Sequence, residues 1–547
     1  MNIRKRLRTL GPVLLLAVAA ISASAGCSGP KPVSAATHVI LFIGDGMSVE
    51  SEIATSRYLY GHDRALAWHS LPGQSYAATW DVTAYNSNAR RARRAEFAET
   101  AFSPALGYDA RREGARPYPD EGAEGADRPV PAPSTDSASA ATALSTGTKT
   151  DSGNIAWRPG DKPAGGLTTI AEEFRARRGG AIGVVTTVPF NHATPAAFIS
   201  HSTSRSRYYT GYKGYAGLGI ADEIILLVKP EVVIGGGHPA LNNPSFDSNK
   251  GYISEGLYHS LQSSTDYVLA ERQAGSDGAR TLDEAADRAL GQGKKLFGLY
   301  GGADGNFALP VPETDSGSPR LARATAEDPS LTDATVAALR VLGRNPKGFF
   351  LMVEQGDIDW ANHDNDFRTM VGAVADLDEA VRGAIAFVDR PGDGVDWTNT
   401  VLVVTADHAT GGLRLNPAKP LRAGELPRQE ARGKEAPPSG PVNGDGQNPQ
   451  PGGPTLAPSV PKAPYLYPGG EVSYSTIGHT NELVTLAVNG SAARLFLEFE
   501  GWWYPGPIID NTQINTAMRE ALRLGRARPA FIVGEEVSGA PAPSARK

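Results

Sequence analysis

The fold class follows from one stretch of the chain, His38-Val39-Ile40-Leu41-Phe42-Ile43-Gly44-Asp45-Gly46. Its apolar residues run without interruption up to Gly44, which is typical of a strand buried on both faces of a parallel sheet. Ser48 follows closely and can cap a helix that runs towards Leu59. The stretch therefore predicts a buried strand, a turn that carries the Asp45 carboxylate, and a helix.

The same pattern recurs along the chain. Further apolar runs are Ala181–Val188, Val232–Gly235, Leu296–Tyr300, Phe349–Val353 and Val401–Thr405. Helical patterns lie between them, among them Leu167–Arg178 and Leu331–Leu342, the second capped by Ser330. This alternation predicts an α/β fold, in which a large, mostly parallel, doubly wound sheet lies between two helical layers. Ligands of such sheets bind beyond the carboxyl ends of the strands.

Length and composition fit one large domain. The chain has 547 residues, 40% of them hydrophobic, and a net charge of −6 without a basic tract, so we expect no nucleic-acid partner. We expect a single domain over 37–535 and a flexible tail over 536–547. Two stretches rich in Gly, Pro or charge, 86–134 and 415–470, read as surface insertions that interrupt it.

The N-terminal segment has the layout of a secretory signal. Four basic residues precede an apolar stretch over 13–21, and small residues follow. We expect 1–27 to be this signal and 28–36 to be a linker, so that the protein is exported to the periplasm or the outer surface. Cys27, the single cysteine, follows Ser24-Ala25-Gly26 as in bacterial lipoproteins, where a lipid on the cysteine tethers the protein to the membrane. Cleavage after Ala23-Ser24-Ala25 is the alternative.

One hydroxyl stands out in the segment Ser134–Ala143. Ser137 lies between an acid and small residues, and the alanine-rich sequence after it predicts a helix. Ser137 would then lie at a helix N-terminus, where free N–H groups favour phosphate. By itself the pattern also fits an ordinary helix cap.

Polar residues at the ends of the predicted strands decide between these interpretations. They are Asp45, Glu354, Asp359, His363, Asp407 and His408, and His479 follows nearer the C-terminus. Carboxylates gathered at one sheet edge repel one another unless cations lie among them. Mixed His and Asp ligands suit zinc, and an all-oxygen set suits magnesium. The sequence thus predicts metal sites beside a serine nucleophile.

Several ordered motifs resemble those of the alkaline phosphatase family. They are Ile43–Met47, Asp136-Ser137-Ala138 with Thr142, His192–Ala197, Thr203-Ser204-Arg205, Glu354–His363, Thr405–His408 and Gly478-His479-Thr480. The resemblance runs from about Val39 to Gly490, apart from the two insertions. It implies a three-layer αβα sandwich, small phosphate monoesters as substrates and a phosphoserine intermediate. A homodimer is expected from the family.

The resemblance also implies a role for each matching residue. Ser137 would be the nucleophile and Arg205 the clamp on phosphate. One zinc ion would be bound by Asp359, His363 and His479. A second zinc ion would be bound by Asp45, Asp407, His408 and the Ser137 oxygen. A magnesium ion would be bound by Asp45, Thr194 and Glu354.

Two residues depart from the best-studied bacterial members. Those carry Asp and Lys where this chain has His192 and Trp360. We therefore expect weaker retention of phosphate, and a third site in which His192 lets zinc or cobalt replace magnesium.

Two other functions compete with phosphomonoester hydrolysis. A phosphodiesterase of the same superfamily would share the metal ligands, although Arg205 suits the extra charge of a monoester. A metal-dependent phosphate-binding surface protein would share them without turnover. A sulfatase is disfavoured, because Ser137 lacks the Pro and Arg that follow the modified residue in that class.

Overall fold

A ten-stranded sheet forms the centre of the computed structural model, which describes residues 36–110, 133–313, 317–431 and 463–525. The strand order is β18-β2-β17-β10-β1-β9-β3-β4-β6-β5. The strands are β1 (His38–Gly44), β2 (Gly73–Ala78), β3 (Ala181–Pro189), β4 (Val232–Gly236), β5 (Tyr267–Glu271), β6 (Lys295–Leu299), β9 (Phe349–Gln355), β10 (Thr400–Thr405), β17 (Val484–Gly490) and β18 (Ile508–Asp510). All pairs are parallel except β17 with its two neighbours, so the mostly parallel α/β sheet is confirmed.

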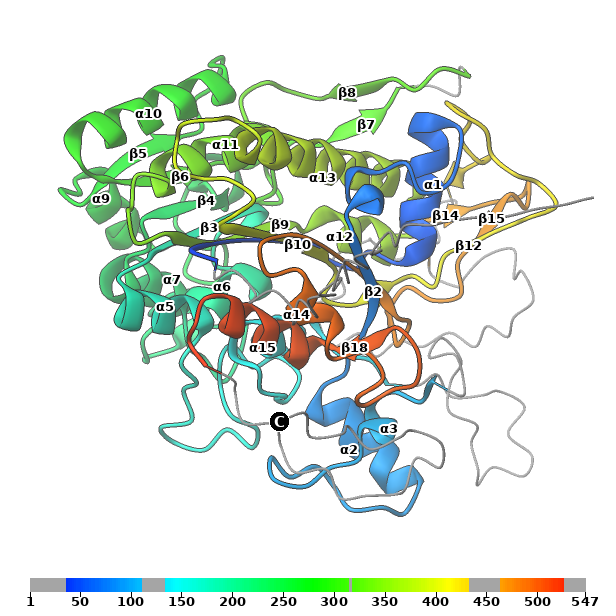
Figure 1. The fold of residues 1–547 in the computed structure, drawn as a ribbon. Helices are drawn as coiled ribbons and strands as arrows, with labels where there is room; N and C mark the ends of the chain where they lie inside the picture. The colour runs from blue at the N-terminus through cyan, green and yellow to red at the C-terminus, as the bar shows by residue number, and fades with distance from the viewer. Residues whose placement is uncertain (1–35, 111–132, 314–316, 432–462, 526–547) are drawn as a thin grey trace, which may run out of the picture. The chain divides into compact units, whose positions relative to one another are not determined.

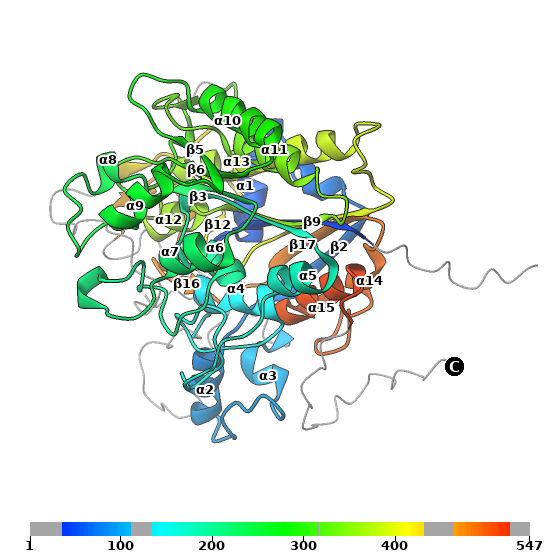
Figure 2. The ribbon, with the colours of Figure 1, turned by 90° about the vertical axis from the view of Figure 1, so that its left-hand side faces the viewer.

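Helices cover both faces of this sheet (Figures 1 and 2). One layer contains α1 (Val49–Tyr60), α10 (Gly278–Gln292), α11 (Leu331–Leu342), α12 (Asp357–His363) and α13 (Phe367–Val388). The opposite layer contains α4 (Ser137–Thr146), α5 (Ile170–Arg178), α6 (Ala193–Ile199), α14 (Arg494–Leu497) and α15 (Asn511–Ala521). The predicted three layers are therefore present in the described part of the chain. Among the described helices, none has both the length and the apolar character that a bilayer crossing requires.

Shorter elements decorate this framework. The short helices are α2 (Val82–Arg91), α3 (Pro104–Gly107), α7 (Ile220–Asp222), α8 (Pro239–Asn242), α9 (Glu255–Gln262), 3₁₀ turns at Ala67–Ser70 and Tyr212–Gly214, and a π-helix at Glu223–Val228. Four two-stranded ladders pair β7 (Pro310–Pro312) with β8 (Leu321–Arg323), β11 (Ala409–Thr410) with β16 (His479–Thr480), β12 (Arg414–Leu415) with β15 (Val472–Ser473), and β13 (Glu430–Ala431) with β14 (Tyr465–Leu466).

Local capping explains where the predicted helices begin. Ser48 caps α1 by accepting a hydrogen bond from Ser51 N at 3.1 Å, as expected. The helix predicted from Leu167 begins later, at Ile170, because Thr169 and Glu172 form a capping box. Ser330 caps α11 at its predicted start.

Both predicted insertions contribute buried residues in the parts that the structure describes, so the expectation of pure surface loops is wrong there. Up to residue 110, the first packs Phe97 and Phe102 against Trp80 and Tyr504 in a small aromatic cluster. These aromatic residues lack helical or strand periodicity, so the sequence did not reveal that they pack together. In the second, Tyr467 is buried and its hydroxyl donates to the Asn365 carbonyl at 2.5 Å. The predicted signal, most of the linker, and the tail lie outside the described residues.

Candidate active site

Three neighbouring strands bring carboxylates to one edge of the sheet. The register pairs Ile43 of β1 with Thr405 of β10 and with Glu354 of β9. Asp45 follows β1 directly, Asp407 lies two residues beyond the end of β10, and Asp407 Oδ1 accepts a hydrogen bond from Gly46 N at 3.1 Å. The predicted strand-end residues therefore converge because parallel strands end at a common edge.

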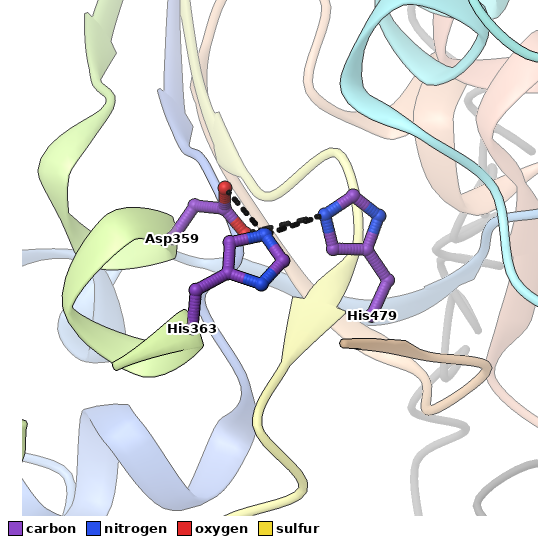
Figure 3. Close-up of side chains that lie close together, drawn as sticks. All are labelled: Asp359, His363 and His479. Carbon is purple, nitrogen blue, oxygen red and sulfur yellow. Dashed lines mark hydrogen bonds and ion pairs between the residues drawn. The ribbon is translucent and has the colours of Figure 1, made fainter. Parts of the chain in front are cut away.

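Asp359, His363 and His479 form the first cluster, called here the α12 cluster (Figure 3). His363 Nε2 lies 3.2 Å from Asp359 Oδ2, and His479 Nε2 lies 3.4 Å from Asp359 Oδ1. The two Nε2 atoms are 3.1 Å apart. Burial tends to lower the pKa of His363, but the Asp359 carboxylate raises it, so this cluster attracts positive charge.

Backbone carbonyls orient the two histidines of the α12 cluster. His363 Nδ1 donates to the Ile477 carbonyl at 2.5 Å, and His479 Nδ1 donates to the Thr135 carbonyl at 2.8 Å. These bonds place the ring proton on Nδ1 and leave Nε2 free to bind a metal. Sequence reasoning missed both carbonyls, because a carbonyl is present at every residue and gives no motif.

Asp45, Asp407 and His408 form the second cluster, called here the β10 cluster, and Ser137 joins it. Ser137 Oγ lies 3.1 Å from His408 Nε2 and 3.5 Å from Asp45 Oδ1. The rings of His408 and His479 stack with their centroids 3.7 Å apart, so the two clusters are adjacent. Ser137 is the first residue of α4, as predicted, and the cap is Asp136, which accepts from Ser139 N at 3.0 Å.

His192, Thr194 and Glu354, expected at a third site, are also buried. Three of their atoms, His192 Nδ1, Thr194 Oγ1 and Glu354 Oε1, have no hydrogen-bond partner among the described residues. Burial raises the pKa of Glu354 to about 7, whereas burial and then Arg205 lower the pKa of His192 to about 3. His192 is thus a neutral ligand candidate, and its ring lies 6.0 Å from that of Trp360.

The donor chemistry of these residues fits bound cations. Burial raises the pKa of Asp45 well above its usual value, and neighbouring carboxylates, foremost Asp407, raise it further. Asp407 Oδ2 likewise has no hydrogen-bond partner in the described part of the chain. Buried acceptors without donors are costly, so a metal ion at each cluster would remove an electrostatic penalty.

Arg205 comes from a separate loop and contacts Asp136, the residue before Ser137. Its Nη1 lies 3.1 Å from Asp136 Oδ2, and Asp136 Oδ1 accepts a hydrogen bond from Gly153 N at 3.0 Å. Asp136 therefore holds the guanidinium beside Ser137. Sequence reasoning did not assign Asp136 a place in the site: its position next to Ser137 was visible, but its partner lies 69 residues away.

His201 fixes the segment that precedes Arg205. Its Nδ1 lies 2.7 Å from Glu223 Oε1, and its Nε2 lies 3.4 Å from Glu172 Oε2. Burial tends to lower the pKa of His201, but the hydrogen bonds and charges of the two glutamates raise it to about 10. The imidazolium ties this segment to α5 and to the π-helix.

This pairing predicts a pH-dependent contribution to stability. Because the folded pKa lies above the ordinary value, the contribution is complete below about pH 6.5 and disappears as the pH rises through about 10. We expect His201→Gln to lower the free energy of unfolding by roughly 2 kcal/mol at pH 7 and by little above pH 10. Denaturant titrations at both pH values measure this. The exposed His259→Gln serves as control, and an equal loss at both pH values would contradict the prediction.

Comparisons with known proteins agree with this geometry. A sequence profile of the alkaline phosphatase family matches residues 122–451. The chain is 34% identical over 281 residues to alkaline phosphatase 4 of Bacillus subtilis, covering 51% of this chain and 50% of that protein. It is 33% identical over 299 residues to the alkaline phosphatase of Escherichia coli, and this match covers 50% of this chain and 58% of that protein. The chain thus spans about half the length of the curated relatives it matches.

Solved structures share the fold over a longer stretch. One is a variant of the alkaline phosphatase from the Antarctic bacterium TAB5, which is 19% identical in sequence and superposes with a TM-score of 0.53. The match includes 90% of this chain and 99% of the TAB5 chain. The alkaline phosphatase of a psychrophilic Shewanella covers 89%, with 99% of that chain covered, a TM-score of 0.53 and 23% identity. Since the family profile matches more than half of the residues, this chain belongs to the alkaline phosphatase family.

Proposed function

We propose that the protein hydrolyses phosphate monoesters to an alcohol and inorganic phosphate through a phosphoserine on Ser137. The observation that carries the proposal is the position of Ser137 Oγ, 3.1 Å from His408 Nε2 in the β10 cluster and at the N-terminus of α4. A serine in this position attacks phosphorus, the alcohol leaves, and water then releases phosphate from the serine.

The metal ligands in this proposal are those of the clusters. Zinc would be bound by the α12 cluster and by the β10 cluster, and magnesium would be bound by Asp45, Thr194 and Glu354. His192 lies beside this third set and favours zinc or cobalt as replacements. When bound, such ions lower the pKa of a coordinated hydroxyl and stabilise negative charge on oxygen.

The chain's own residues bind and orient the phosphate. The guanidinium of Arg205 can grip two phosphate oxygens, and Asp136 keeps it aimed at Ser137. The free N–H groups at the start of α4 add positive potential where the phosphate would lie. This surplus of positive charge favours a dianionic monoester over a monoanionic diester.

Two nitrophenyl esters test the proposal against its alternatives. The purified, metal-loaded protein should hydrolyse 4-nitrophenyl phosphate much faster than bis(4-nitrophenyl) phosphate, and metal analysis should find more than one ion per chain. Faster hydrolysis of the diester would favour the phosphodiesterase. Binding of phosphate without hydrolysis of either ester would favour a phosphate-binding protein.

Trp360 gives a prediction about product release. Trp360→Lys places a positive charge near the proposed phosphate site, so we expect the inhibition constant of inorganic phosphate to fall by about fivefold to tenfold. Competition with 4-nitrophenyl phosphate measures it. Trp502→Lys makes the same change on an exposed part of the chain, where the side chain is 41% exposed, and should leave the constant unchanged. Unchanged inhibition in both variants would refute this role of Trp360.

Export and assembly remain proposals that accompany this function. We infer export to the periplasm or outer surface from the basic and apolar residues of 1–27, with Cys27 as the candidate lipid anchor. Mass spectrometry of the protein purified from membranes distinguishes a lipid on Cys27 from simple cleavage. Light scattering tests the homodimer that we expect from the family.

A further inference from the structure

A cavity of about 610 Å³ is lined in part by α12, the helix that also carries Asp359 and His363 of the α12 cluster. Asp357, Trp360, Ala361 and Asp364 line it, and their spacing places them on one side of the helix. Asp359 and His363 of the α12 cluster project from a different side of the same helix. Trp360 lies between the two sides: it lines the cavity, and its ring also lies near His192 of the third set.

The cavity has a surplus of negative charge. Arg272 is the cation among its lining residues, and Glu327 and Asp328 already neutralise it at 2.7 Å each. Asp304 Oδ1 accepts a hydrogen bond from Asn306 N at 3.0 Å, but no cation pairs with this carboxylate in the described chain. Asp364 also lines the cavity, where its carboxylate is repelled by Asp366, a second lining residue, and attracted by His363 of the α12 cluster.

A buried acceptor in the cavity lacks a donor. Asn306 lines the cavity and is 4% exposed. Its Nδ2 donates to Asp357 Oδ1 at 2.6 Å, which fixes the orientation of the amide, and its Oδ1 has no partner among the described residues. A ligand that brings N–H donors would satisfy this oxygen.

Trp360 connects the cavity with the proposed active site. Its ring lies 6.0 Å from that of His192, one of the residues of the third set, and the same residue lines the cavity. The face of an indole attracts cations, and a cavity of this volume suits a small organic group. An anionic ligand in this position would be repelled by Asp304 and Asp364.

We propose that the cavity is a subsite for the alcohol part of the substrate and that it favours alcohols that carry an ammonium group. The proposal rests on the proposed phosphomonoesterase function. The phosphate would lie at Ser137 and Arg205, and the alcohol would pass along Trp360 so that its ammonium reaches Asp304, Asp364 and Asn306 Oδ1. The negative charges of Asp304 and Asp364 would then balance the positive charge of the ammonium group, while the phosphate end of the substrate lies at Ser137 and Arg205.

Two substrates of nearly equal shape test this specificity. In 2-aminoethyl phosphate an ammonium replaces the terminal methyl group of propyl phosphate. We expect the intact metal-loaded enzyme to show a kcat/KM ratio of at least about tenfold in favour of the ammonium ester. Asp304→Asn and Asp364→Asn should each lower this ratio by about fivefold, chiefly through KM. Asp266→Asn, an exposed carboxylate paired with Lys229, should leave it unchanged.

The outcomes separate the two proposals. Hydrolysis of both esters with a ratio near one, or a ratio that both variants leave unchanged, overturns the subsite and leaves the phosphomonoesterase function standing. Hydrolysis of neither ester overturns both. If the variants instead lose a bound calcium or magnesium ion without a change in the ratio, the cavity holds a divalent cation and the ammonium subsite is wrong.

Discussion

Ser137→Ala is expected to lower kcat/KM for 4-nitrophenyl phosphate by roughly 10⁴-fold. The substitution removes the Oγ that lies beside His408 and Asp45, so no covalent intermediate can form. Charge stabilisation by Arg205 and by cations bound at the two clusters would remain, and it would support a slow direct attack by water. Initial rates with metal-loaded parent and variant measure the loss.

A matched variant distinguishes chemistry from folding. Ser145→Ala makes the same change two turns further along α4, where the hydroxyl donates only to the Thr142 carbonyl at 3.3 Å, and it should retain parental activity. Acid-quenched parent enzyme should retain labelled phosphate, whereas Ser137→Ala should retain none. If Ser137→Ala, with full metal content, hydrolysed the ester as fast as the parent, the covalent mechanism would be refuted.

Removal of the metals is expected to abolish activity and also to destabilise the fold. The clusters gather buried carboxylates that repel one another, and bound cations compensate that repulsion. A metal present at about 100 times its dissociation constant adds about 2.7 kcal/mol of stability. We therefore expect a chelator to lower the unfolding temperature by roughly 5 °C, and added zinc to restore both properties.

Two histidine variants test whether the effect of the chelator arises at the α12 cluster. His479→Ala removes one ligand of the α12 cluster, so it should lose activity and show a smaller chelator-induced drop in unfolding temperature. His259→Ala changes an exposed histidine and should respond to the chelator like the parent. An unfolding temperature that no chelator lowers would argue against metals at the clusters.

The centre of the fold could be predicted because its strands are buried on both faces. β1, β3, β9 and β10 are continuous apolar runs, and each was found within two residues of its observed bounds. β2 was missed because Gln74, Ser75 and Gly73 interrupt its apolar character. Strands near a sheet edge lose the signal that burial on both faces imposes.

The residues of the proposed site could be predicted from the sequence, but the contacts that orient them could not. Residues with rare chemistry at strand ends, such as Asp45 and His408, could be identified before any geometry was known. The contacts that orient them could not, because they join distant segments through common groups. The Asp136 to Arg205 ion pair and the carbonyl of Ile477 are examples.

The hydrogen bond from His479 to the Thr135 carbonyl has a consequence for when the proposed active site is assembled. It joins segments 344 residues apart in the chain, and His479 lies on β16, close to the last strands of the sheet. During synthesis α4, which carries Ser137, is made early, but the α12 cluster lacks its third member until β16 has emerged and folded. A chain that has not yet folded as far as β16 therefore carries Ser137 without the complete α12 cluster, so the proposed active site is assembled only after residue 479 has been added.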